Sequence, residues 1–272
     1  MKQRIITALV LAPLAIAAVL WLPTAVFMGL VAAILLLGLW EFARLAGLPQ
    51  RHLRAAVLAL NAGLIGWLAW LGWSDQAYRL IALLGVIWWL LAAAWLGRVP
   101  MAREPTTANL LLKLGVGSLL VIPCWAAAAL LHHDGAYGPR WTLFALLLVW
   151  GADTFAYFVG SRLGGAKLAP SISPGKTWAG FWGGMAGVAL ISAAAVPLLG
   201  LGYARWPLLL VLALATGVAS VVGDLFESLI KRHSGAKDSG DLVPGHGGVM
   251  DRLDSILAAL PVFVVLKGWL GL

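Results

Sequence analysis

The chain has 272 residues, of which 62% are hydrophobic and only 11% are charged. A soluble domain is usually about 45–50% apolar and about 25% charged, so this composition excludes an ordinary globular protein and favours a membrane protein. The formal charge of +8 does not indicate a nucleic-acid partner, because the chain has no long basic run and its charges lie at the ends of apolar segments.

Nine apolar segments reach or approach the roughly 18–20 residues that a helix needs to cross a bilayer. We therefore predict an all-α, polytopic bundle of about nine transmembrane helices. About five spans fall in an N-terminal region, 1–140, and about four fall in a C-terminal region, 141–272, which also holds two polar loops and is the expected functional region. The predicted spans are 5–22, 24–43, 55–72, 79–97, 110–131, 141–160, 178–199, 207–230 and 253–271.

The first predicted span resembles a signal peptide, because Lys2 and Arg4 precede its apolar run. That run extends to Trp21, however, and no convincing small-residue cleavage site follows it, so we interpret it as a retained helix. Only residues 22–24 separate it from the next span. The two spans therefore form either a tight hairpin or a re-entrant pair.

Basic residues are distributed unequally between the two sides of this topology. Fifteen of the nineteen Lys and Arg residues fall on the side of the N-terminus and the even-numbered loops. Positively charged loops stay in the cytoplasm, so we expect the N-terminus and both polar loops to be cytoplasmic. A compact chain with basic inner loops fits the inner membrane of a bacterial cell.

The sixth predicted span contains an acid, Asp153, inside the apolar run 148–157. A charge within a membrane span is costly and by default marks a functional site. The alternative is a buried carboxyl group that only bonds to a neighbouring helix. We favour the functional interpretation.

The first polar loop, 161–177, carries Lys167, Ser173, Lys176 and Thr177. A helix N-terminus with nearby lysines and hydroxyls attracts anions, so these residues are candidates for binding phosphate groups. The loop is not a Walker motif, because the Gly-x-x-x-x-Gly-Lys spacing is absent. Glycines then recur along the seventh span and predict close helix packing rather than chemistry. They are Gly180, Gly183, Gly184 and Gly187.

The end of the eighth span carries Asp224, Glu227 and Ser228, and Lys231 follows directly; the four residues are spaced 0, 3, 4 and 7, so they share one helical face. Such a stripe is usually a solvated surface. Here the helix is leaving a membrane, so the stripe is more typical of a polar cavity.

The second polar loop, 231–252, carries Lys237, Asp238 and a glycine-rich stretch around His246. Glycines let backbone N–H groups approach an anion closely, so Gly247 and Gly248 are candidates for contacting phosphate. A lone histidine is more often structural. We favour a functional His246, because its glycine neighbours offer no side chains for it to pack on.

The chain enters the ninth span through Asp251 and Asp254, which lie three residues apart on one helical turn. Acids favour a helix start, so capping is the simple explanation. One acid would suffice for a cap, and two acids near Asp224 suit a divalent cation. Mg²⁺ prefers such hard oxygen ligands together with substrate phosphates. A second cation in the same site stays an open alternative.

Together these motifs closely resemble the signature of the phosphatidate cytidylyltransferase family. The most specific similarity lies in 228–232, 237–240 and 244–254. Weaker similarity reaches the beginning of the chain, at 4–9 and at Trp40-Glu41-Phe42, so the resemblance covers the whole chain.

The resemblance implies that the chain joins CTP to phosphatidic acid, giving CDP-diacylglycerol and pyrophosphate. It also implies dependence on Mg²⁺, a homodimer and a catalytic role for 141–272. The expected catalytic residues are Asp224, Lys237, Asp251, Arg252 and Asp254, the three acids also being the expected metal ligands. The expected substrate-binding residues are Asp153, Lys167, Ser173, Lys176, Thr177, Ser228, Lys231, Arg232, Asp238, His246, Gly247 and Gly248.

Three other functions compete with this one. An ion- or proton-coupled transporter would also use Asp153 and Asp224, but the acids cluster at one edge and no inverted repeat is visible. A CTP-dependent lipid-alcohol kinase would have related chemistry. A CDP-alcohol phosphotransferase requires a different acid pattern, which the chain lacks.

Overall fold

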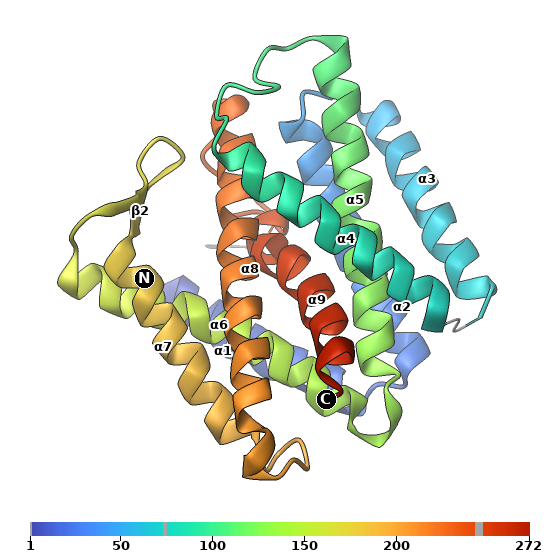
Figure 1. Cartoon of the computed structure of the whole chain (residues 1–272). Coiled ribbons are helices and arrows are strands. Elements are labelled where there is room, and N and C mark those ends of the chain that lie inside the picture. Colours follow the sequence, from blue (N-terminus) through green and yellow to red (C-terminus); the bar gives the residue numbers. More distant parts are fainter. Residues whose placement is uncertain (1, 73–74, 243–246) are drawn as a thin grey trace.

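The computed structural model describes residues 2–72, 75–242 and 247–272, with side chains from residue 9 onward. This part of the chain folds into nine α-helices, which Figure 1 shows packed as one bundle. The helices are α1 (Lys2–Trp21), α2 (Thr24–Leu45), α3 (Arg51–Trp70), α4 (Asp75–Leu96), α5 (Thr107–His132), α6 (Gly138–Leu163), α7 (Trp178–Ala195), α8 (Trp206–His233) and α9 (Met250–Leu270). The predicted all-α class is confirmed.

Eight of these helices, α2 to α9, are long and apolar enough to cross a membrane. For α1, only the described stretch Leu9–Trp21 enters this assessment. The chain is therefore a multi-pass integral membrane protein, as predicted. Most helices extend a few residues beyond the predicted spans at one or both ends, because backbone hydrogen bonding continues into polar ends, whereas α7 ends at Ala195, before the predicted 199. Thr106, for example, caps α5 by accepting a hydrogen bond from Asn109 N at 3.2 Å.

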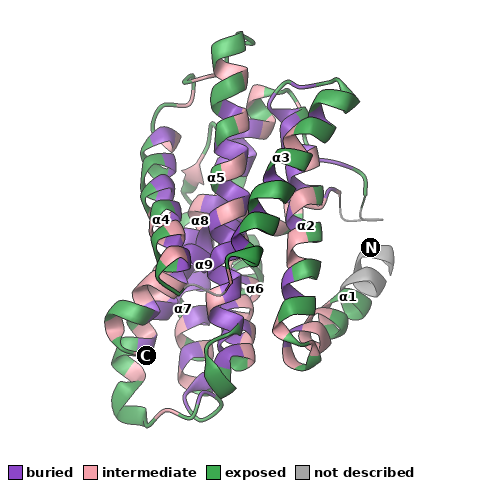
Figure 2. Ribbon diagram, turned by 90° about the vertical axis from the view of Figure 1, so that its right-hand side faces the viewer, coloured by how far each residue is buried: buried purple, intermediate pink, exposed green. Residues whose placement is uncertain are grey.

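The buried residues concentrate on α5, α8 and α9, as Figure 2 shows. Phe226 on α8 packs edge-on against three indole rings of α4, with centroid distances of 5.6–5.9 Å. Those rings belong to Trp88, Trp89 and Trp95. Edge-to-face pairs add stabilisation beyond burial of their area. The aromatic cluster thus joins the N-terminal helices to the helix that carries the acid-rich face.

The first polar loop contains a β-hairpin that the sequence analysis did not predict. Strands β1 (Lys167–Ala169) and β2 (Ser173–Thr177) pair antiparallel and project beside α6 and α7 (Figure 1). Strand β2 was difficult to predict because it contains Pro174 and Gly175, and both residue types are rare within strands. Arg232 Nε on α8 donates to Ile172 O at 3.1 Å, which fastens the hairpin to the bundle.

The glycines of α7 pack against α6, as predicted. A Cβ atom at Gly183 would lie 2.5 Å from Val159 Cβ, and one at Gly184 would lie 2.9 Å from Ala152 O. Both distances are shorter than normal contacts, so any larger side chain would force the helices apart. This close packing positions Asp153 of α6 near the hairpin and α8.

Candidate active site

The polar face predicted on α8 exists in the structure. Lys231 Nζ lies 2.5 Å from Glu227 Oε2 in an ion pair one helical turn apart. Ser228 Oγ donates to Asp224 Oδ1 at 3.4 Å. The four polar side chains of this face, at relative positions 0, 3, 4 and 7 along α8, therefore lie on the side of the helix that faces α9 and the hairpin.

Lys231 also connects α8 to the beginning of α9. Its Nζ donates to Asp251 Oδ1 at 2.6 Å, so it bridges Glu227 and Asp251. Glu227 is only 1% exposed, and its Oε1 has no hydrogen-bond partner among the described residues. Burying a carboxylate is costly unless a cation compensates it, so Lys231 holds this junction together. Glu227 belongs to the polar face that the sequence predicts, but no role for it was predicted.

Asp251 holds the second polar loop against the start of α9. Its Oδ2 accepts hydrogen bonds from Ser239 N and Gly248 N, each at 2.9 Å. The hydroxyl of Ser239 also lies 2.9 Å from the same oxygen. With Lys231 on Oδ1, both oxygens of Asp251 already have protein partners.

Glu41 of α2 secures the same loop from the N-terminal half of the chain. Its Oε2 accepts from Met250 N at 2.9 Å and lies 2.9 Å from Ser239 Oγ. Arg44 Nη2, one turn along α2, donates to Ser239 O at 2.5 Å. Neither Glu41 nor Arg44 was predicted to be part of the site. Two features of the sequence could have indicated a role for Glu41. It lies in the element 40–42, which resembles the family, and it is an acid within an apolar helix.

Two glycines allow this close approach. A Cβ atom at Gly248 would collide with Ser239 Oγ and Glu41 Oε2, and one at Gly240 would collide with Glu41 Oε1. Gly247 adopts a φ of +82°, which favours glycine. Gly240 and Gly248 therefore serve loop packing, and contact between Gly247 or Gly248 and substrate phosphate stays a prediction.

A second charged cluster lies where α6, α8, α9 and the hairpin meet. Lys176 Nζ forms an ion pair with Asp224 Oδ2, joining the hairpin to α8. Asp254 lies within electrostatic range of Asp224 and Asp153, so three carboxylates from three helices share one region. Lys176 and Arg252 act electrostatically on Asp153 in the same region.

The carboxylates of this cluster are the type of ligand that a magnesium ion prefers, but they are not arranged as a complete set of metal ligands. No group of three His, Cys, Asp or Glu side chains within the described residues is arranged to hold a metal. Asp224 and Asp254 nevertheless offer hard oxygen atoms in a region of excess negative charge, which is what Mg²⁺ prefers. Asp251 is engaged by Lys231, Ser239 and Gly248. The shared site of the three acids stays a prediction.

The remaining predicted residues are distributed around these two clusters. Lys167 and Lys237 are exposed, as is Asp238, while Ser173 pairs with Ala169 in the hairpin. Thr177 is buried and its Oγ1 accepts from Gly180 N at 3.1 Å, so this hydroxyl caps α7. Their predicted substrate contacts stay predictions. His246 lies outside the described residues.

Comparison with known proteins covers nearly the whole chain. A protein from Pseudomonas aeruginosa named phosphatidate cytidylyltransferase is 42% identical over 278 residues, which cover 99% of this chain and 98% of that protein. One of the same name from Haemophilus influenzae is 35% identical over 284 residues, 97% of each chain. One from Bacillus subtilis is 43% identical over 130 residues, 48% of each chain.

The family model agrees with these relatives. The model described as the cytidylyltransferase family matches residues 2–269. That range includes Glu41, the hairpin, the polar face of α8 and the start of α9, so every element of the candidate site lies within the match. The chain therefore belongs to the cytidylyltransferase family, as its motifs predicted.

Proposed function

We propose that this protein is a phosphatidate cytidylyltransferase, which transfers the CMP moiety of CTP to phosphatidic acid and releases pyrophosphate. The observation that carries the proposal is the charged cluster of α6, α8, α9 and the hairpin. It combines the Lys176–Asp224 ion pair with Asp254 and Arg252, in a chain whose full-length relatives bear that name. Lysine, arginine and carboxylate groups in one place suit a reaction between two polyanions.

In this reaction an oxygen of the lipid phosphate attacks the α-phosphorus of CTP. A new P–O bond forms, the bond from that phosphorus to the oxygen bridging to the β-phosphate breaks, and pyrophosphate leaves with the electron pair. A phosphate monoester has a second pKa near about 6, so the nucleophile is already ionised near neutral pH and needs no strong protein base. The protein's task is to align the two phosphates and stabilise the leaving group.

Charged side chains at different positions in the cluster would perform different parts of this task. Lys176 on the hairpin and Arg252 on α9 flank the carboxylates and would hold phosphate groups of CTP. Asp224 and Asp254 would hold Mg²⁺, with Asp251 as a third candidate ligand, and the ion would neutralise phosphate charge. Lys231 and Asp251 fix the geometry of α8 against α9.

The protein's setting is part of the proposal. The distribution of basic residues supports an orientation with the N-terminus and the candidate site on the cytoplasmic side of a bacterial inner membrane, where CTP is available. A site at the ends of membrane helices can receive a water-soluble nucleotide and a bilayer lipid together. A homodimer is expected from the family resemblance alone.

The decisive experiment is incubation of the purified protein with CTP labelled in its α-phosphate, phosphatidic acid and Mg²⁺. Label should appear in CDP-diacylglycerol in equal amount to the pyrophosphate released. A lipid-alcohol kinase would instead release CDP and leave the label in water-soluble nucleotide. The proposal is wrong if no labelled lipid forms while a relative from Pseudomonas aeruginosa is active in the same assay.

A further inference from the structure

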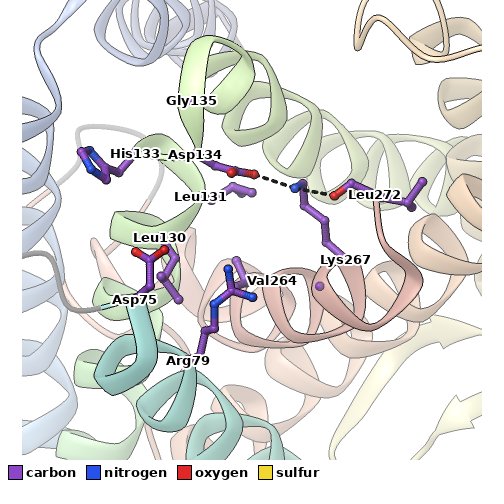
Figure 3. A pocket seen from close by; sticks show the side chains of 11 residues that line it. Asp75, Arg79, Leu130, Leu131, His133, Asp134, Gly135, Val264, Lys267 and Leu272 are labelled. Carbon is purple, nitrogen blue, oxygen red and sulfur yellow. Dashed lines mark hydrogen bonds and ion pairs between the residues drawn. The ribbon is translucent and has the colours of Figure 1, made fainter.

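A large polar pocket lies at the end of the bundle opposite the candidate active site. It has a volume of about 670 Å³ and is formed by the start of α4, the turn after α5 and the end of α9 (Figure 3). Asp251 and Lys267 are sixteen residues apart on α9, which corresponds to about 24 Å along a helix. The pocket therefore belongs to a different part of the molecule from the acid cluster.

The pocket carries two positive and two negative side chains. Lys267 Nζ forms an ion pair with Asp134 at 2.6 Å and donates to Leu272 O at 2.7 Å (Figure 3). Arg79 and Asp75 lie one turn apart at the start of α4, and neither joins an ion pair within the described residues. One cation and one anion thus remain available to a ligand, and the Asp, Arg and Lys side chains of the pocket balance one another in charge.

The polar pocket continues into an apolar groove between α4 and α9. The groove has a volume of about 440 Å³ and shares Asp75, Arg79, Val264 and Gly268 with the pocket. Its remaining wall is mostly hydrophobic. The side chains that complete it are Gln76, Leu80, Leu83, Val265 and Trp269. Leu80 is 56% and Trp269 is 74% exposed, so the groove opens at the outer surface of the bundle.

We propose that this pocket and groove bind one phospholipid with a zwitterionic headgroup of the phosphoethanolamine type. Arg79 would bind the phosphate, Asp75 would bind the ammonium group, and an acyl chain would lie along Leu80, Leu83 and Trp269. A polar chamber that opens into an apolar groove at a helix end matches a lipid at the edge of a bilayer. Balanced charge favours a zwitterionic lipid over an anionic one, which distinguishes this site from one for phosphatidic acid.

The test is native mass spectrometry of the full-length protein, purified in detergent and titrated with phosphatidylethanolamine, phosphatidylglycerol or phosphoethanolamine without acyl chains. The wild type should retain phosphatidylethanolamine, and should bind the other two at least about tenfold more weakly, since each lacks one of the two recognition elements. Equal retention of phosphatidylglycerol, or equal binding of free phosphoethanolamine, would show that the site is not the proposed one.

Two pairs of variants test the two halves of the site. Arg79→Gln should weaken phosphatidylethanolamine retention about tenfold, because a charged contact is lost, whereas Arg140→Gln, at the same end of the bundle but outside the pocket, should not. Leu83→Trp fills the groove and should have a similar effect. Its control is Leu84→Trp, which lies outside both cavities and is exposed.

Cytidylyltransferase activity and elution as a single species serve as folding controls, since none of these residues lies near the acid cluster. A misfolded Arg79→Gln would be replaced by Arg79→Lys, for which intermediate retention is expected. Unchanged lipid retention in both Arg79→Gln and Leu83→Trp contradicts the proposal. If Leu83→Trp instead turns a dimer into monomers with retention unchanged, a second copy covers the groove and the lipid assignment is wrong.

Discussion

Asp224 and Asp251 are both expected metal ligands, but their surroundings differ. Asp251 accepts from two backbone N–H groups and pairs with Lys231, while Asp224 is partly exposed and faces Lys176. A carboxylate with several protein donors stabilises its loop, whereas one facing a single cation can exchange partners with a ligand. The two acids should therefore respond differently to the same substitution.

We predict that Asp224→Asn and Asp251→Asn each lower turnover by about 10²-fold or more, because charge stabilisation of the transition state is lost. Only Asp251→Asn should also lower the free energy of unfolding, by about 1–3 kcal/mol, since a neutral amide accepts more weakly from Ser239 N and Gly248 N and no longer forms an ion pair with Lys231. Turnover and thermal unfolding of the purified variants check both effects. Wild-type stability of Asp251→Asn, with a raised Mg²⁺ requirement, would favour metal binding as its main role.

Glu41 is a positioning residue, because it touches the loop rather than the charged cluster. Glu41→Gln keeps the size of the side chain but removes the charge that accepts from Ser239 Oγ and Met250 N. We predict a loss of about 1–3 kcal/mol in stability and faster proteolysis within residues 237–248. Turnover should fall with little change in the KM for CTP.

The matched control is Glu104→Gln, an exposed acid outside the site. If Glu41→Gln and Glu104→Gln show the same proteolysis rate and turnover, then Glu41 does not position the loop.

At the scale of elements, α6 and α7 approach as closely as their small residues allow. We predict that Gly183→Val lowers the unfolding temperature and activity together, because the new methyl groups would meet Val159 at the helix contact. Overpacking of this kind costs about 1–3 kcal/mol. Gly63→Val is the control, since a side chain at Gly63 would meet nothing within 4 Å. Equal unfolding temperatures for the two variants would contradict the packing explanation.

The elements also show which features the sequence could predict. Residues spaced three or four apart share a helical face. The contacts of Asp224 with Ser228 and of Glu227 with Lys231 could therefore be predicted from their spacing in the sequence. The β-hairpin was missed because Pro174 and Gly175 are typical of turns. Glu41 was not assigned because its partner Ser239 is 198 residues away, and no local pattern encodes such a contact.

At the scale of the whole molecule, the distribution of basic residues predicts one orientation in the membrane. Cysteines introduced at Arg103 and Lys237, in a Cys124→Ala background, should resist an impermeant thiol reagent applied to intact cells. A cysteine at Arg205 should react, because it lies at the opposite end of α8 and of the topology. Permeabilised cells provide the control for reactivity. Labelling of position 237 from outside intact cells would reverse the orientation.

The bond from Glu41 to Met250 N has a consequence for biosynthesis. These residues are 209 positions apart, and translation at roughly 5–20 residues per second needs about 10–40 s to cover that interval. During this time α2 can enter the membrane while its acid still lacks both loop partners. The loop around Ser239 can close only when the ribosome has released the start of α9. Catalytic competence is thus one of the last properties that the nascent protein acquires, and a chain interrupted before residue 250 would be inserted yet inactive.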